Sequence, residues 1–222
     1  MTLGPLRHTV AKIGDDWDWQ QIARLSPFTR ADGSGPARQQ TKVRLCHDGR
    51  YLRVRFDCDD LVIWGNYEKR DDPLYLEEAV EVFIAPGADD PARYFEFEFS
   101  PDGVIWDGII SNPGLDGSGF QADIAWNCKG VQWQTVRNDA QHTWHVWLAL
   151  PLKELCGGGE IPKLWRANFY RIDRPKNELN DALAEFSCWS PTHTSPASFH
   201  MPRHFGTLTL GEEDEQEDDT GR

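Results

Sequence analysis

The chain has 222 residues, and its 36 acidic and 23 basic side chains give a formal net charge of −13 at pH 7. Nucleic acids and anionic membrane surfaces are bound largely through Lys and Arg, so this charge argues against both as partners. The length suits one large all-β domain, and the ten tryptophans exceed what a core of this size usually needs. Aromatic side chains that stack on a flat ligand would account for the surplus.

Strand signals begin with a hairpin. Residues 41–57 alternate apolar and polar side chains on both sides of Asp48-Gly49, a dipeptide typical of two-residue hairpin turns. Further strand-like runs begin at Ala79, Tyr94, Gly103, Gly130, Thr143, Trp165 and Gly206. Helical patterns are confined to residues 17–25 and 152–155. Many short strands separated by turns, without alternating helices, predict an all-β fold: a single-domain antiparallel β-sandwich with few short helices.

The two ends of the chain differ from its middle. We expect residues 1–40 to form a strand and loop segment packed on the domain, and residues 41–210 to form the sandwich. Residues 211–222 hold seven acidic side chains, one basic side chain and no apolar one. Such a segment cannot bury enough surface to offset the entropy of ordering, so we predict an acidic disordered tail.

Cysteine usage and the N-terminal residues bear on the compartment. The chain has five cysteines and no C-x-x-C pair, so it offers neither a zinc ribbon nor a thioredoxin-like motif. An odd number of thiols fits a reducing compartment. The N-terminal residues lack the apolar run of a signal peptide, and no stretch approaches the roughly 20 apolar residues that span a bilayer. We therefore expect a cytoplasmic protein, with secretion as the alternative if the printed sequence is a trimmed form.

The first candidate site is an acidic cluster at a strand end, formed by Asp57, Asp59 and Asp60 in the sequence FDCDD. Calcium takes about six to eight hard oxygen ligands, and such a cluster can supply several of them. The spacing lacks the glycine and the closing glutamate of an EF-hand loop. The alternative is a solvated strand end whose carboxylates accept hydrogen bonds from loop amides.

The second candidate is a group of glutamates in and beside two neighbouring predicted strands: Glu77, Glu78, Glu81, Glu96 and Glu98. In YFEFEFS, strict alternation places Glu96, Glu98 and Tyr94 on one face and the phenylalanines on the other. A face of acids beside a tyrosine can hydrogen-bond sugar hydroxyls, and it is also what any solvated sheet face looks like. Two of these carboxyls could equally serve as the acid and the nucleophile of a glycosidase.

Histidines and serines offer little catalytic pattern. The pairs His142–His145 and His200–His204 lack the context of a metal-binding helix, so we expect surface or loop histidines. No serine lies in a nucleophile-elbow sequence, so no catalytic triad is predicted.

Two aromatic residues, Tyr75 and Phe199, lie in Pro-containing loop segments rather than in strands. They serve either as loop packing or as platforms for a flat ligand. A sugar ring offers an apolar C–H face to such a platform and leaves its hydroxyls for polar groups at the rim.

Six segments, in their order along the chain, resemble carbohydrate-binding module family 9, and in particular its stand-alone family 9-like proteins. They are TKVRLCHDGRYLRVRFDCDD, PLYLEEAVEVFIAP, YFEFEFSPDG, TWHVWLALP, WRANFYRID and CWSPTHTSPASFHMPRHFGTLTL, which together extend over most of residues 41–210. The resemblance implies a DOMON-like β-sandwich of the immunoglobulin-like or jelly-roll type. It also implies binding of the ends of xylans or of β-glucans such as cellulose, with structural calcium in the region of Asp57, Asp59 and Asp60. We expect a monomer.

The resemblance also assigns individual residues to a sugar site. Tyr75 and Phe199 stand where the family has the two aromatic platforms that hold the terminal sugar, and Glu81 matches the glutamate that ends its D-S-V-E motif. The family's next polar contacts are a basic and an amide residue on the following strand, where this chain carries Glu96 and Glu98. This departure changes the charge that is offered to the sugar.

The sequence leaves three functions open. The first is non-catalytic carbohydrate binding, in which the loop aromatics stack on a sugar and Glu81, Glu96, Glu98 and His200 hydrogen-bond its hydroxyls. The second is a carbohydrate-active hydrolase that uses a pair of these glutamates. The third is a scaffold whose ancestral site has decayed, or a haem-binding DOMON-like protein with His200 or Met201 as the axial ligand.

Overall fold

The computed structural model describes residues 5–212 and is built almost entirely of β-strands. The strands are β1 Arg7–Lys12, β2 Thr29–Arg30, β3 Thr41–His47, β4 Tyr51–Asp59, β5 Ala79–Pro86, β6 Arg93–Phe99, β7 Ile105–Ser111, β8 Gln121–Asp123, β9 Gln132–Asn138, β10 Thr143–Pro151, β11 Leu164–Asp173, β12 Glu185–Cys188 and β13 Gly206–Leu210. The helical turns are η1 Leu74–Leu76, η2 Asp139–Gln141, α1 Leu152–Leu155 and η3 Pro202–His204. Within the described range, no helix is both long and apolar enough to cross a bilayer.

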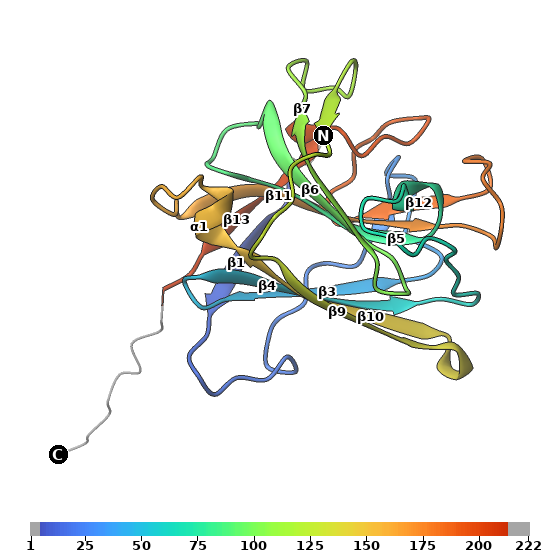
Figure 1. The fold of residues 1–222 in the computed structure, drawn as a ribbon, viewed down its shortest axis with the longest axis horizontal. Helices are drawn as coiled ribbons and strands as arrows, with labels where there is room; N and C mark the ends of the chain where they lie inside the picture. The colour runs from blue at the N-terminus through green and yellow to red at the C-terminus, as the bar shows by residue number, and fades with distance from the viewer. Residues whose placement is uncertain (1–4, 213–222) are drawn as a thin grey trace.

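The strands form one curled sheet that folds over into two layers. Its hydrogen-bonded order is β8-β7-β6-β5-β11-β13-β1-β3-β4-β10-β9, with β12 and β2 extending from β11. In Figure 1, β3, β4, β9 and β10 form one layer, and β5, β6 and β11 lie in the layer that faces it. Apart from the two ladders made by β1, the pairings between these strands are antiparallel. The predicted all-β sandwich with few short helices is confirmed.

Strand β1 joins the two halves of this sheet. Its first residues pair in parallel with β13, from Arg7 opposite Thr207 to Val10 opposite Leu210. Its last residues, Ala11 and Lys12, pair in parallel with β3. The segment 1–40, predicted to pack on the domain, therefore contributes a strand to the interior of the sheet. Of the predicted acidic tail 211–222, the residues beyond Glu212 lie outside the described range.

Alternation along the strands fills the space between the layers with apolar side chains. On β5, Val80, Val82 and Ile84 belong to the main core, where Phe56 of β4 meets Phe169 of β11 with ring centroids 6.2 Å apart. Burial of each such side chain stabilises the fold by about 1.5–3 kcal/mol. The residues between them on β5 must then face the other side of the sheet.

That other side carries a second, smaller aromatic cluster, which includes Phe83, Tyr94, Trp106, Tyr170 and Phe205. The ring of Phe83 lies 4.8 Å from that of Tyr170 and 5.5 Å from that of Tyr94. Loops rather than a second sheet cover this face. The cluster thereby forms the base of a hollow between the sheet and its loops.

Candidate functional site

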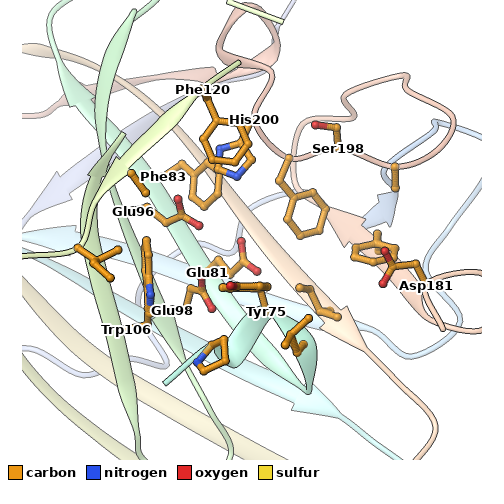
Figure 2. A pocket seen from close by; sticks show the side chains of 18 of the residues that line it. Tyr75, Glu81, Phe83, Glu96, Glu98, Trp106, Phe120, Asp181, Ser198 and His200 are labelled. Atoms are coloured by element: carbon orange, nitrogen blue, oxygen red, sulfur yellow. The ribbon is translucent and has the colours of Figure 1, made fainter. Parts of the chain in front are cut away.

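A cavity of about 600 Å³ lies on this outer face of β5, β6, β7 and β11. Its floor is made by strand residues, and its walls are made by η1, by the loop between β7 and β8, and by the loop before η3. In Figure 2 the carboxyl groups of Glu81 and Glu96 lie between the ring of Tyr75 and the rings of Phe120 and His200. Acids and aromatic rings are therefore the main components of this cavity.

Three glutamates form the floor. Glu81 of β5 pairs directly with Glu98 of β6, and Glu96 lies two residues before Glu98 on the same face. Glu81 is 2% exposed, Glu96 is 5% exposed and Glu98 is 0% exposed. The alternation predicted for YFEFEFS is observed, because the phenylalanines at 97 and 99 point into the main core instead. This face is not the solvated surface that was the alternative.

Burial dominates the electrostatics of the floor. It raises the pKa of Glu81, Glu96 and Glu98 well above their usual range, since a charge in a poorly hydrated site is unfavourable. The negative charge of each neighbouring carboxyl raises the pKa values further, as Glu98 does for Glu81. The carboxyl of Glu98 interacts with that of Glu96 and with the backbone N–H of Tyr75, but neither of its oxygens makes a hydrogen bond of normal geometry. The floor therefore includes one fully buried carboxyl, Glu98, that the protein bonds only weakly.

Aromatic rings line the walls. Tyr75 lies in η1 and is 46% exposed, so one face of its ring is available to a ligand. Phe199 also lines the cavity but is 7% exposed, because it stacks on Tyr170 with ring centroids 4.2 Å apart. Trp106 lies on β7 opposite Glu98, and Phe186 completes the apolar wall. Tyr75 is therefore the more accessible of the two predicted platforms.

His200 is a neutral polar group at the cavity wall. Its ring stacks on Phe120 with centroids 3.7 Å apart, and its Nδ1 lies 2.8 Å from the hydroxyl of Tyr94. Burial lowers the pKa of His200 to about 4. The imidazole therefore carries no charge at neutral pH and can exchange hydrogen bonds but cannot balance the glutamates.

A basic residue at the cavity rim is already engaged. Arg174 donates from Nη2 to Oδ1 of Asp181 at 2.6 Å and to the backbone oxygen of Tyr75 at 3.2 Å. In the first contact, the positive charge of Arg174 is paired with the carboxylate of Asp181, another residue of the rim. The second holds η1, and with it the aromatic ring of Tyr75, against the end of β11.

The six residues predicted for sugar binding, Tyr75, Glu81, Glu96, Glu98, Phe199 and His200, all line this one cavity. They come from segments more than 100 residues apart in the sequence. Sequence reasoning missed Trp106, Phe120 and the pair Arg174–Asp181. The turn at Pro101-Asp102-Gly103 would have identified Trp106, because pairing across this turn places it opposite Glu98. Phe120 and Asp181 lie in loops and carry no such signal.

Comparison with known proteins places the chain in a family. The model of carbohydrate-binding family 9 matches residues 19–210. The chain belongs to carbohydrate-binding family 9.

Relatives of this family 9 chain are distant in sequence. A curated protein of Arthroderma benhamiae, named "Extracellular protein", is 28% identical over 178 residues, which are 77% of this chain and 78% of that protein. A solved structure from Bacteroides uniformis, described as a "putative carbohydrate-binding protein", has a TM-score of 0.73 at 18% identity and covers 93% of this chain and 99% of its own. A family 9 module of Caldicellulosiruptor kristjanssonii in complex with cellotriose has a TM-score of 0.61 at 14% identity and covers 95% of this chain and 96% of its own. These structures share the fold of the family 9 chain.

The calcium ligands expected from the family resemblance do not converge. Asp57 on the outer face of β4 accepts hydrogen bonds from Arg44, Arg55 and His145 at 2.7–2.8 Å. Although burial opposes the change, the bonds from His145 and Arg55 lower the pKa of Asp57 to about 2. Its carboxylate is therefore already saturated by basic groups and is not free to bind an ion.

The other two predicted ligands point in different directions. Asp59 lies beside Lys42, with 3.3 Å between Nζ and Oδ2. Asp60 instead faces the interior, where its Oδ2 accepts from Nε1 of Trp144 at 2.9 Å. Strand alternation is the reason, because residues 57 and 59 share one face of β4 and residue 60 leaves the strand toward the core. The structure therefore does not bring the carboxyls of Asp57, Asp59 and Asp60 together.

Asp60 meets two other acids, and Glu78, Asp173 and Asp60 each offer an oxygen within 4.8 Å of the others. Nη2 of Arg171, a fully buried side chain, lies 2.9 Å from Oδ2 of Asp60. Burial, followed by the charge of Asp60, raises the pKa of Glu78 to about 10, so this carboxyl is neutral. A guanidinium thus stands where a cation would bind, and N–H donors cover Asp60. These residues do not fit a calcium ion.

Proposed function

We propose that this protein binds carbohydrate without modifying it, holding a sugar ring of a β-glucan or xylan type glycan in the cavity above Glu81, Glu96 and Glu98. One observation carries the proposal: loop aromatics and strand carboxyls that were separately predicted for a sugar site line a single cavity. Family membership supports it, and so does the family 9 module from Caldicellulosiruptor kristjanssonii, which is known in complex with cellotriose and with glucose.

The ring of Tyr75 supplies the stacking surface in this proposal. A half-exposed tyrosine at a cavity rim packs against the C–H face of a sugar and contributes about 1 kcal/mol beyond the area that it buries. Neutral His200 and the glutamate floor then exchange hydrogen bonds with the hydroxyls. Phe199 contributes indirectly, because its ring lies on Tyr170 and supports the wall.

The arrangement of the carboxyl groups favours binding over hydrolysis. A glycosidase needs two carboxyls on opposite sides of the scissile bond, about 5–9.5 Å apart. Glu81 and Glu98 are cross-strand neighbours on one sheet face, and Glu96 follows on that same face. All three carboxyls therefore contact a ligand in the cavity from the same side, that of the sheet. Attack and protonation from opposite sides of a sugar are therefore not provided by this floor.

Haem binding, the other alternative, finds little support at the same wall. His200 uses its Nδ1 for the Tyr94 hydroxyl, and Phe120 covers one face of its ring at 3.7 Å. An absorbance spectrum of the protein incubated with haemin tests this alternative, and we expect no Soret band of a ligated haem.

Titration calorimetry with cello- and xylo-oligosaccharides tests the proposed function. We expect Tyr75→Ala to weaken binding about five- to ten-fold, because the stacking contribution is lost. Trp147→Ala is the matched control, since this half-buried aromatic residue lies on β10 in the other layer. Equal affinity of Tyr75→Ala and the wild type would remove Tyr75 from the site. Release of reducing sugar during the titration would contradict the non-catalytic role.

A further inference from the structure

Resting on the proposed function, we propose that the sugar preferred by this cavity carries a free amine, so that the ligand class is an amino sugar such as an unacetylated glucosamine oligosaccharide. The reason is an excess of buried carboxyl groups inside an aromatic cavity. Among the described residues that line the cavity, Arg174 is the one Arg or Lys side chain, and its ion pair is with Asp181 rather than with a glutamate of the floor.

The charge imbalance can be followed around the wall. The acidic side chains that line it are Asp71, Glu81, Glu96, Glu98 and Asp181. The basic side chain on the same wall, Arg174, is held by Asp181 at 2.6 Å. His200 is neutral. Asp71 pairs with Arg70 outside the lining, so the acids that no described cation pairs with are the three glutamates of the floor. A cationic group of the ligand would supply that charge.

Glu98 lacks a cationic partner within the floor. Its side chain is 0% exposed and meets the carboxyl of Glu96 and the backbone N–H of Tyr75, but neither of its oxygens makes a hydrogen bond of normal geometry. Burial of an unpaired carboxyl destabilises a protein. A glutamine in the same place would also hydrogen-bond neutral hydroxyls, and it would avoid the cost of burying an ionisable group. An uncharged sugar can hydrogen-bond these acids but makes no use of their negative charge. A site for an ammonium group gains a charge-assisted hydrogen bond from each carboxylate in reach.

The spacing of the carboxyls favours an organic cation over a metal ion. In the part of the chain that the structure describes, the acids with oxygens within 4.8 Å of one another are Asp60, Glu78 and Asp173, not the three glutamates of the floor. A metal ion gathers its ligands into one small shell. An amino sugar instead distributes one ammonium group and several hydroxyls around a ring, and it can engage carboxyls that lie further apart.

Aromatic residues complete the recognition of a cationic ring. Tyr75 and Trp106 stand beside the glutamates in Figure 2. The faces of such rings attract an ammonium group, and they also stack on the C–H face of the sugar that carries it. A linear amine would use only the first of these contacts. The same walls therefore favour an amino sugar over a simple amine.

Proton release gives this proposal a distinctive signature. Burial raises the pKa of all three glutamates and thereby favours their protonated forms in the ligand-free floor. The other titratable groups that face it are Tyr75 of η1, Tyr94 of β6, Tyr170 of β11, His200, Asp71, Asp181 and Arg174. Tyr94, Tyr170 and His200 are neutral at pH 7.5 because burial opposes their charged forms. An ammonium group favours carboxylates, so its binding expels protons from the glutamates.

Calorimetry with a glucosamine disaccharide, cellobiose, the N-acetylated disaccharide and putrescine separates the alternatives. At pH 7.5 we expect the glucosamine disaccharide to bind about ten-fold or more tightly than cellobiose, with a heat that changes with the ionisation enthalpy of the buffer. Glu81→Gln and Glu96→Gln should reduce this preference to about three-fold or less while cellobiose still binds. The matched control, Glu160→Gln, removes an exposed acid outside the cavity and should change neither value.

The outcomes distinguish this inference from the function on which it rests. Tighter binding of cellobiose or of the N-acetylated sugar, or an amine preference unchanged in both glutamine variants, overturns the amino sugar alone. Putrescine binding as tightly as the disaccharide overturns the sugar part of the inference. Absence of binding by every saccharide overturns the proposed function together with it.

Discussion

Two groups of acids lie at or near the interior of this protein, and they differ in whether a cation balances them. Asp60, Glu78 and the half-buried Asp173 lie around Arg171, whose guanidinium lies 2.9 Å from Asp60. In residues 5–212 no Arg or Lys pairs with Glu81, Glu96 or Glu98, and these three open to a cavity of about 600 Å³.

The difference shows how similar side chains serve stability in one place and binding in another. Around Arg171, N–H donors and one cation offset the cost of desolvating Asp60. On the cavity floor, Glu98 meets the carboxyl of Glu96 and the backbone N–H of Tyr75 without a hydrogen bond of normal geometry, and among the described residues no cation pairs with it. An unmet demand beside open space is the signature of a ligand site, whereas an internally satisfied cluster is part of the fold.

Removing the balancing cation should produce the largest effect. Arg171→Met leaves Asp60 buried with its charge uncompensated, so we expect the free energy of unfolding to fall by about 3–5 kcal/mol. Urea unfolding monitored by tryptophan fluorescence measures it. Lys163→Met is the control, because this lysine and its partner Glu212 are both exposed, and its loss should cost less than about 1 kcal/mol. A loss as small as that of Lys163→Met would contradict the balance proposed for this cluster.

Replacing Glu98 of the cavity floor by a neutral side chain should raise the free energy of unfolding, and only at higher pH. The folded protein raises the pKa of Glu98 above its unfolded value. Below about pH 4.5 the group is protonated in both states and does not affect stability, whereas at higher pH it ionises more readily in the unfolded state and lowers the free energy of unfolding. We expect Glu98→Gln to match the wild type near pH 4 and to be about 1 kcal/mol or more stable at pH 8. Unfolding curves at both pH values check this. Parallel pH profiles for the two proteins would show that Glu98 does not titrate as argued.

The smallest expected effect is on saccharide affinity, through the packing of Trp106 against Gly108 in the cavity wall. A Cβ atom on Gly108 would lie 3.0 Å from the Trp106 indole and 3.3 Å from the backbone oxygen of Asp123. Gly108→Ala should therefore displace the indole and weaken saccharide binding about two- to five-fold. Gly14→Ala is the control, because its Cβ would meet no atom within 4 Å. Calorimetry of both variants decides whether Trp106 belongs to the binding wall.

Strand periodicity made much of the fold and part of the site predictable. The alternation in YFEFEFS put Glu96 and Glu98 on one face, and the same rule applied to FDCDD would have separated Asp60 from Asp57 and Asp59. Periodicity does not tell which face a loop will cover, so burial of the glutamates was not predictable from it.

The partners of Asp60 and the upper wall of the cavity depend on longer-range packing. Glu78 and Arg171 meet because β5 pairs with β11 across more than 90 residues of sequence. Phe120 reaches His200 through a loop whose path is determined by what it packs against. Neither contact can be predicted from the sequence immediately around the residues that make it.

Strand β1 has a consequence for where the folding unit begins. The family match starts at residue 19, yet β1 occupies Arg7–Lys12 and pairs with both β13 and β3. A chain shortened to the matched residues would expose the unpaired backbone edges of two strands at once, and such edges promote aggregation. A stable folding unit therefore has to include the residues from β1 onward, which the bounds of the family match alone would discard.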